Sequence, residues 1–201
     1  MVPPSDYYDD HASEFIADTL SVDMEEVYKP FLSRVPPGGR ILDAGCGSGR
    51  DTLAFHNKGY DVVSIDASAK MVELAKLLTG RPVFRMRFQE IQWVEEFDGI
   101  WACASLLHVP KIEMDEVWRR LINALKPGGA WFMSFKKGQG ESIRKGRFFN
   151  DYEEQELRAL IEKQQDIELL QLWTTRDVRR GREQEQWTNA IVRRVRSRKW
   201  F

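Results

Sequence analysis

The sequence contains few cysteines and histidines, no long apolar run and no excess of either charge. Its 201 residues include two cysteines, Cys46 and Cys103, and three histidines. Two cysteines cannot build a disulfide framework, and these spacings fit no metal site. No apolar stretch approaches the roughly 20 residues that cross a bilayer. We therefore expect a soluble protein without a metal centre, a structural disulfide or a membrane association.

Length and the first residues set expectations for organisation and location. A chain of this size buries enough apolar surface for one core, so a single domain is expected over residues 1–201. Residues 1–35 would form a helical lid and residues 36–201 the core. The opening MVPPSDYYDDHASEF is acidic and lacks the basic-then-apolar layout of a secretory signal. This predicts a cytoplasmic location.

Charge is balanced over the whole chain but not locally. Thirty basic and 31 acidic residues give a formal net charge of −1, which provides no general attraction to nucleic acid or anionic membranes. Between Arg176 and Lys199, however, nine residues are Lys or Arg and three are acidic. This basic cluster indicates either an acidic partner or, more commonly for such clusters, a solvated face of a surface hairpin.

From residue 40 onward, short apolar runs alternate with longer amphipathic stretches. This pattern is typical of βα units around a parallel sheet, and it predicts a doubly wound α/β fold. The expected strands are Arg40–Cys46, Asp61–Asp66, Val83–Phe88, Asp98–Cys103 and Ala130–Phe135, and the expected helices are Arg50–Lys58, Ser68–Leu78, Met114–Leu125 and Asp151–Lys163. Ser68 and Asp151 have the sequence context of helix N-caps, the latter with Glu154 completing a capping box.

The two ends of the chain depart from this pattern. Ile167–Thr174 and Gln186–Val195 are predicted strands whose connection is too short for a helix, so they must form an antiparallel hairpin. Ahead of the sheet, Ser5–Thr19 and Asp23–Leu32 are predicted helices, expected to cover the open end of the sheet as the lid.

Three glycines at alternate positions follow the first strand, in Asp43-Ala-Gly-Cys-Gly-Ser-Gly49. Alternating glycines remove the β-carbons that would keep a ligand from the backbone, and they allow a tight turn into a helix. A dinucleotide-binding pattern, Gly-x-Gly-x-x-Gly, would need glycine where this chain has Arg50. The spacing suits instead a ligand whose amino-acid end lies on the turn, with the Asp43 carboxylate meeting its ammonium directly or through water.

An acid stands at the end of the second strand, in Val62-Val-Ser-Ile-Asp66. In nucleotide-binding sheets an acid at this place accepts two hydrogen bonds from a ribose diol. The alternative is a cap for the helix that begins at Ser68. Because the glycine turn and Asp66 follow neighbouring strands, both are expected at the edge where open α/β sheets bind ligands.

These motifs resemble those of the class I S-adenosylmethionine-dependent methyltransferases over about residues 35–195. The segments that carry the resemblance are ILDAGCGSGRD at 41–51, VVSIDAS at 62–68, FDGIWACASLLHV at 97–109 and LKPGGAWFMSF at 125–135. Within this class the chain is similar to small bacterial enzymes of the type that modifies tellurite or thiols. The resemblance implies a Rossmann-like, seven-stranded, mostly parallel sheet of order 3-2-1-4-5-7-6 with strand 7 antiparallel.

The resemblance also implies a cofactor, S-adenosylmethionine, and a product, S-adenosylhomocysteine. The methionine portion would lie on the glycine turn, the ribose on Asp66 and the sulfonium above the end of the fourth strand. Where the family often has an acid after strand 3 to meet adenine, this chain has Arg87-Phe-Gln-Glu90, so Gln89 is the expected substitute. The cofactor-binding residues predicted in this way are Asp43, Gly45, Cys46, Gly47, Gly49, Arg50, Asp66, Ala67, Met71, Gln89, Cys103 and Ala104.

Methyl transfer from a sulfonium is an in-line displacement with a neutral leaving group, so the protein mainly aligns the acceptor and excludes water. His108, just beyond the fourth strand, is either a general base or a residue that contacts the cofactor or caps the turn before Pro110. Tyr8 in the lid either covers the cofactor with its ring or is a packing residue of the fold. The loop at 135–149 is either a substrate wall, with Lys136, Arg144 and Arg147 holding an anionic acceptor, or a mobile, solvated loop.

The absence of an appended domain favours a small-molecule acceptor. RNA methylation through the basic C-terminal hairpin is an alternative, but the fourth strand lacks the Asp/Asn-Pro-Pro-aromatic motif of many amino-methylating nucleic-acid enzymes. A module that binds the cofactor without catalysis is a third possibility. Monomer and homodimer are equally compatible with the sequence.

Overall fold

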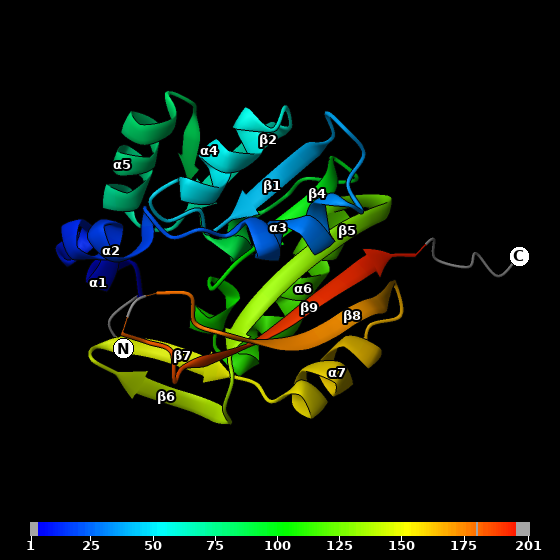
Figure 1. Cartoon of the computed structure of the whole chain (residues 1–201). Coiled ribbons are helices and arrows are strands. Elements are labelled where there is room, and N and C mark those ends of the chain that lie inside the picture. Colours follow the sequence, from blue (N-terminus) through cyan, green and yellow to red (C-terminus); the bar gives the residue numbers. More distant parts are fainter. Residues whose placement is uncertain (1–3, 180, 196–201) are drawn as a thin grey trace, which may run out of the picture.

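The computed structural model describes residues 4–179 and 181–195 and has one large central sheet (Figure 1). Its strands are β1 (Arg40–Ala44), β2 (Asp61–Asp66), β3 (Val83–Arg85), β4 (Phe97–Ala102), β5 (Leu125–Lys136), β8 (Ile167–Arg176) and β9 (Gln186–Arg194). Their order is β3-β2-β1-β4-β5-β9-β8. The first five run parallel, whereas β9 is antiparallel to both β5 and β8. The predicted doubly wound sheet with an antiparallel last strand is therefore confirmed.

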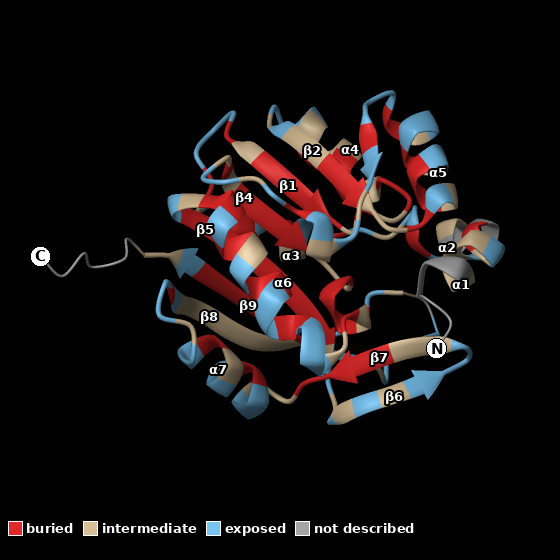
Figure 2. Ribbon diagram, turned by 180° about the vertical axis from the view of Figure 1, so that it is seen from behind, coloured by how far each residue is buried: buried red, intermediate tan, exposed pale blue. Residues whose placement is uncertain are grey.

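Helices cover both faces of this sheet, because its central strands are apolar on both sides. They are α1 (Pro4–Asp10), α2 (Ala12–Thr19), α3 (Glu25–Leu32), α4 (Arg50–Asn57), α5 (Ala69–Thr79), α6 (Lys111–Ala124) and α7 (Glu154–Glu162), with single 3-10 turns η1 (Phe88–Glu90) and η2 (Leu106–His108). Figure 2 shows the buried residues concentrated in β1, β4, β5 and β9. On one face Trp118 of α6 meets Trp131 of β5. On the other, Trp101 of β4 stacks on Phe132 with ring centroids 4.0 Å apart.

The N-terminal segment expected as a helical lid forms three helices. Its first predicted helix is divided into α1 and α2, and α3 lies against the sheet, because Tyr28 and Phe31 share one apolar side of that helix. Phe31 is fully buried beside Phe55 and Trp101. Of these helices, α1 packs against α5 and β7 at the open end of the sheet (Figure 1).

A second, two-stranded sheet occupies part of the predicted loop at 135–149. Strands β6 (Gly140–Arg144) and β7 (Arg147–Asp151) pair antiparallel. The two residues between them, Lys145 and Gly146, have φ of 49° and 76°, the positive values that a tight type I′ turn requires. The predicted loop is therefore a hairpin beside α1 at these residues (Figure 1), and Glu141, Ile143, Arg144 and Lys145 are exposed on it.

Two predicted boundaries also differ. Asp151 ends β7 and does not cap α7, whose N-cap is Glu153, with the Glu153 backbone N–H donating to Glu156. The third strand ends at Arg85, because the chain turns there into η1. Ser68 does cap α5, its hydroxyl accepting from the Met71 backbone N–H at 3.0 Å.

Candidate active site

A cavity of about 1130 Å³ opens where β1, β2, β4 and β5 end. The glycine turn, Asp66, Cys103 and Lys136 come from these four strand ends. Tyr8 of α1, the segment from Thr19 to Val27, the residues after β3, η2, the hairpin β6–β7 and the β8–β9 connection also line it. It lies at the carboxyl edge of the parallel strands, where the sequence predicted the ligand site.

The glycine turn is held tightly beneath the cavity. The backbone N–H groups of Gly45 and Cys46 both donate to the Ile65 carbonyl at 2.9 Å, which ties the turn to β2. Gly45 has φ of 84°, and a β-carbon on it would overlap that of Ser105. Only glycine therefore fits between β1 and the Ser105 segment, and the turn presents bare backbone to the cavity.

Asp66 lies at the cavity and is fixed by backbone. One of its oxygens accepts from Gly47 N–H and the other from Ser68 N–H, both at 2.9 Å. Burial raises the pKa of Asp66, although these two N–H groups lower it. A carboxylate has about four acceptor positions, so both oxygens can still accept from two neighbouring hydroxyls. The place therefore fits a ribose diol.

Asp51, and not the predicted Asp43, borders the cavity. Asp43 does not line the cavity; it is buried under the turn and accepts from the Thr52 hydroxyl at 2.6 Å. Asp51 does line the cavity, and it accepts from Tyr28, Trp101 and Arg50. Burial raises the pKa of Asp51, but the Arg50 guanidinium outweighs this and holds the pKa below its usual range. An anionic group therefore faces the turn from Asp51, a residue that the sequence analysis passed over although it follows Arg50 directly.

Most of the other predicted residues do meet at the cavity. Gly49 is an exception: it caps α4 with φ of 85° and packs against Ala75 of α5, where a β-carbon would crowd that helix. The predicted residues that line the cavity are Tyr8, Gly45, Cys46, Gly47, Arg50, Asp66, Ala67, Met71, Gln89, Cys103, Ala104, His108, Lys136, Arg144 and Arg147.

The end of β4 forms the floor. Ala104 adopts φ of 52°, unusual for a residue with a side chain, and its backbone N–H donates to Ser134 at 2.8 Å. The Ser105 hydroxyl donates to the Ala44 carbonyl at 2.7 Å. Burial raises the pKa of Cys103 to about 12, so its thiol stays protonated at neutral pH and is a poor nucleophile.

Gln89 lines the cavity beside two residues that the sequence analysis missed. Its side-chain amide donates to Glu113 at 2.5 Å, so α6 fixes its direction. Met86 and Phe88 border the same part of the cavity. Since neither had a polar signature, only their position after β3 could have indicated them.

His108 is held from both sides. Its Nδ1 lies 2.7 Å from the Phe148 carbonyl, which can only accept, so Nδ1 carries the proton. Nε2 is then an acceptor for the Tyr8 hydroxyl at 2.8 Å. Burial lowers the pKa of His108 to about 4, with Arg147 and Arg144 adding to this effect against the Phe148 carbonyl. The imidazole is therefore neutral near pH 7, and α1 is tied to β7 through it.

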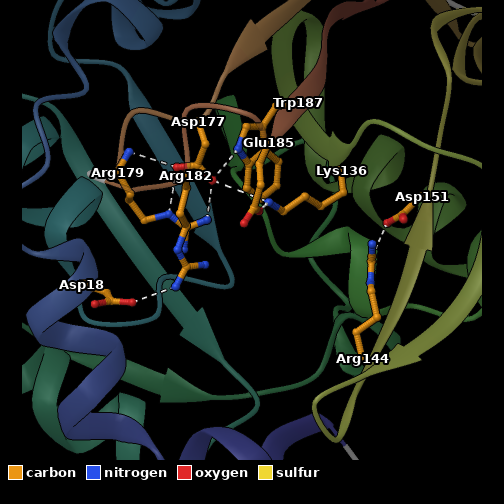
Figure 3. Close-up of polar contacts among 9 residues, drawn as sticks. All are labelled: Asp18, Lys136, Arg144, Asp151, Asp177, Arg179, Arg182, Glu185 and Trp187. Atoms are coloured by element: carbon orange, nitrogen blue, oxygen red, sulfur yellow. Dashed lines mark hydrogen bonds and ion pairs between the residues drawn. The ribbon is translucent and has the colours of Figure 1, made fainter.

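A cluster of ion pairs closes the opposite side of the cavity (Figure 3). Lys136 pairs with Glu185 and, at 3.5 Å, with Asp177, and it lies 4.5 Å from the centre of the Trp187 ring. Asp177 also accepts from Arg179 and from the Trp187 indole. Burial lowers the pKa of Lys136 to about 8, although Asp177 raises it. The sequence analysis did not find this cluster, because its members come from β5 and the β8–β9 connection.

The described residues 4–179 and 181–195 contain no group of three or more His, Cys, Asp or Glu side chains placed to hold a metal ion. No helix within them is long and apolar enough to cross a membrane. Cys46 and Cys103 are both free thiols.

Known proteins share both sequence and fold with this chain. Residues 41–129 match the methyltransferase domain family. The chain is 32% identical over 106 residues to the ubiquinone biosynthesis O-methyltransferase of Xanthomonas campestris, covering 49% of this chain and 43% of that protein. It is also 32% identical over 120 residues to the magnesium-protoporphyrin O-methyltransferase of Rhodobacter capsulatus, covering 52% and 54%. The chain thus spans about half the length of the curated relatives it matches.

A crystal structure supports the same classification at the level of the fold. The 1,6-didemethyltoxoflavin-N1-methyltransferase of Burkholderia thailandensis, bound to 1,6-didemethyltoxoflavin and S-adenosylhomocysteine, superposes with a TM-score of 0.68 at 20% identity, covering 98% of this chain and 92% of that one. The strand order and this superposition show that the two proteins share a fold, and the sequence match to the methyltransferase domain family lies within residues 41–129.

Proposed function

We propose that the protein transfers a methyl group from S-adenosylmethionine to a small-molecule acceptor. The observation that carries the proposal is the cavity between the bare glycine turn and the Asp66 carboxylate. The relatives named as a ubiquinone biosynthesis O-methyltransferase and a magnesium-protoporphyrin O-methyltransferase support it. When bound, S-adenosylmethionine would supply a methyl group, which a nucleophile on the acceptor would take by in-line displacement of neutral S-adenosylhomocysteine.

The residues at the cavity suit the parts of this cofactor. Asp66 would accept the ribose hydroxyls, and Gly45 and Gly47 would leave room for the methionine backbone. Arg50 and Asp51, already paired with each other, would meet the carboxylate and ammonium. Ala67, Met71, Met86, Phe88 and Gln89 would surround adenine, and Cys103 and Ala104 would lie beneath the sulfonium.

The protein's own contribution to the reaction is placement and exclusion of water. Tyr8 and the hairpin β6–β7 cover the cavity on the side of α1. His108 would hold Tyr8 in place in its neutral form. With a pKa of about 4, it would remove an acceptor proton weakly at neutral pH. An acceptor that ionises readily, or a neutral amine that attacks before it loses a proton, therefore suits this site better than an alcohol.

A small acceptor suits the charge distribution better than RNA. Within the described part of the basic cluster, Arg179, Arg182, Arg193 and Arg194 each pair with a carboxylate. Neutralised cations offer little of the potential on which binding to a phosphate backbone depends. Arg180, Arg196, Arg198 and Lys199 of the same cluster lie outside the described residues.

Ligand-induced stabilisation tests the cofactor assignment. S-adenosylhomocysteine at 100 times its Kd should add about 2.7 kcal/mol to the native state and raise the Tm by roughly 5–10 °C. Asp66→Asn should remove most of this shift. Asp61→Asn, at the exposed opposite end of β2, is the matched control and should keep it. A shift with a nicotinamide dinucleotide but none with S-adenosylhomocysteine would reject the assignment.

Label transfer then separates catalysis from binding alone. The protein and methyl-labelled S-adenosylmethionine are incubated with panels of metabolites, thiols and RNA, and the labelled product is isolated. Label in a small molecule supports the proposal. Label in RNA favours the alternative acceptor, and stabilisation by the cofactor without any transfer favours a binding module.

A further inference from the structure

Arg147, at the start of β7, presents a guanidinium packed among aromatic rings. Its Cζ lies 4.9 Å from the ring centre of Tyr7, 5.1 Å from that of Phe149 and 6.0 Å from that of Tyr8. Rings that cover the flat faces of a guanidinium leave its N–H edges free to donate. Arg147 also lines the cavity, so this group borders the space expected for the acceptor.

The other two cations predicted to hold an acceptor are already paired. Lys136 is engaged by Glu185 and Asp177, and Arg144 donates to Asp151 at 2.7 Å (Figure 3). Arg147, in contrast, forms no ion pair with a carboxylate among the side chains that the structure describes, a set that leaves out residues 1–6, 13, 15, 17, 180 and 196–201. Of the three cations predicted to hold an anionic acceptor, Arg147 is therefore the best candidate.

The polar groups of Arg147 are also incompletely satisfied. Its Nε is shielded from solvent and has no hydrogen-bond partner among the described residues. A buried donor without an acceptor is costly, and a charged one more so. A ligand that supplied two acceptor oxygens in the plane of the guanidinium would satisfy it, as carboxylates and phosphates do in two-pronged pairs.

Arg147 and Arg144 both act on His108: besides burial, the two guanidinium groups lower the pKa of that imidazole. Tyr8 borders both this region and the cofactor side, since its ring centre lies 6.0 Å from Cζ of Arg147 and the next residue, Asp9, accepts from the Ser68 hydroxyl, two positions after Asp66. An anion beside Arg147 would therefore lie next to the predicted ribose site.

We propose that Arg147 binds an anionic group, a carboxylate or a phosphate, on the methyl acceptor. The inference rests on the proposed function and narrows its substrate class. The aromatic rings of Tyr7, Tyr8 and Phe149 around the guanidinium favour an acceptor whose anionic group is attached to a planar or apolar body. Arg144 and Lys136 then stabilise the walls of the cavity, because each forms an ion pair with a carboxylate of the protein.

Calorimetric titration with simple probes tests this subsite. Protein saturated with S-adenosylhomocysteine is titrated with benzoate, phenyl phosphate and the neutral benzamide. The wild type should bind at least one anion and bind benzamide at least tenfold more weakly. Arg147→Gln should weaken anion binding tenfold or more, and Arg147→Lys, which keeps the charge without the two-pronged geometry, should fall between. Lys163→Gln, an equal charge loss at the exposed residue that follows α7, is the control and should match the wild type.

Several results would overturn the inference. These are equal binding of benzamide, no binding of either anion to the wild type, and unchanged anion binding in Arg147→Gln. A loss of S-adenosylhomocysteine affinity in Arg147→Gln would assign the guanidinium to the cofactor instead. A failure of the proposed function is distinguishable, because the wild type would then not bind S-adenosylhomocysteine in the first titration, before any anion is added.

Discussion

The Tyr8 hydroxyl donates a 2.8 Å hydrogen bond to Nε2 of His108, a residue distant in the sequence. This contact joins α1 to η2, and the Phe148 carbonyl extends it from His108 Nδ1 to the hairpin β6–β7. Three segments around the cavity therefore meet at one neutral imidazole, and protonating that imidazole would break the contact with Tyr8.

His108 should make stability depend on pH. The pKa is about 4 in the folded protein and near 6.5 when unfolded. As pH falls from 6.5 to 4, the unfolded chain binds a proton that the native state does not, so stability is lost at up to about 1.4 kcal/mol per pH unit. The free energy of unfolding in urea should fall by this slope between pH 6.5 and 4 in the wild type and not in His108→Gln, which lacks the titrating group. An equal pH dependence of that free energy in the two proteins would contradict the prediction.

Gly45 should tolerate no side chain. Gly45→Ala combines a positive φ with overlap between the new β-carbon and that of Ser105. Gly59→Ala is the matched control, since Gly59 has φ of 87° and no atom within 4 Å of a built β-carbon. The control should lose about 1–2 kcal/mol of the free energy of unfolding from backbone strain alone, and Gly45→Ala several kcal/mol more. Adding Ser105→Gly to Gly45→Ala should recover part of this additional loss. If no stability is recovered, the overlap with Ser105 is not its cause.

The central fold was predictable because its signals are local. Apolar runs ending in turn residues located β1, β2 and β4, and the short final connection required the antiparallel pair β8–β9. The hairpin β6–β7 was missed because its strands mix charged and apolar residues, and its turn is Lys145-Gly146 in place of the commoner Asn-Gly.

The site residues that belong to a short motif at a strand end could be predicted from the sequence. Those that depend on contacts between residues distant in the sequence could not. The glycine turn and Asp66 follow strand ends and were located from the sequence. That Asp51 and not Asp43 faces the cavity depends on Tyr28 and Trp101, which approach from other elements. The Lys136–Asp177 pair likewise joins positions 41 apart, and nothing in their neighbourhoods along the chain indicates it.

Asp177 should anchor the β8–β9 connection. Burial raises its pKa, but the hydrogen bonds and charge of Arg179 outweigh this and lower the pKa to about 2, against 3.8 ordinarily. The carboxylate therefore contributes about 2 kcal/mol at pH 7, present above pH 3.8 and lost as pH falls toward 2. Asp177→Asn should lower the free energy of unfolding by this amount at pH 7 and change it little near pH 2. Asp18→Asn breaks the exposed pair with Arg182 and should cost under about 1 kcal/mol; equal losses would reject a special role for Asp177.

Tyr28 should stabilise the fold through Asp51. Its buried hydroxyl donates to the carboxylate at 2.6 Å, and a hydrogen bond to a charged group contributes about 1.5–3 kcal/mol. Tyr28→Phe should lose that amount in urea unfolding, because Asp51 keeps only its Arg50 and Trp101 donors. Tyr60→Phe, a half-buried tyrosine in the same apolar cluster, should change stability by less than about 0.5 kcal/mol. If Asp51 also meets the ammonium of the cofactor, Tyr28→Phe should change S-adenosylhomocysteine affinity as well, whereas a loss of stability with unchanged affinity would make Asp51 a structural residue.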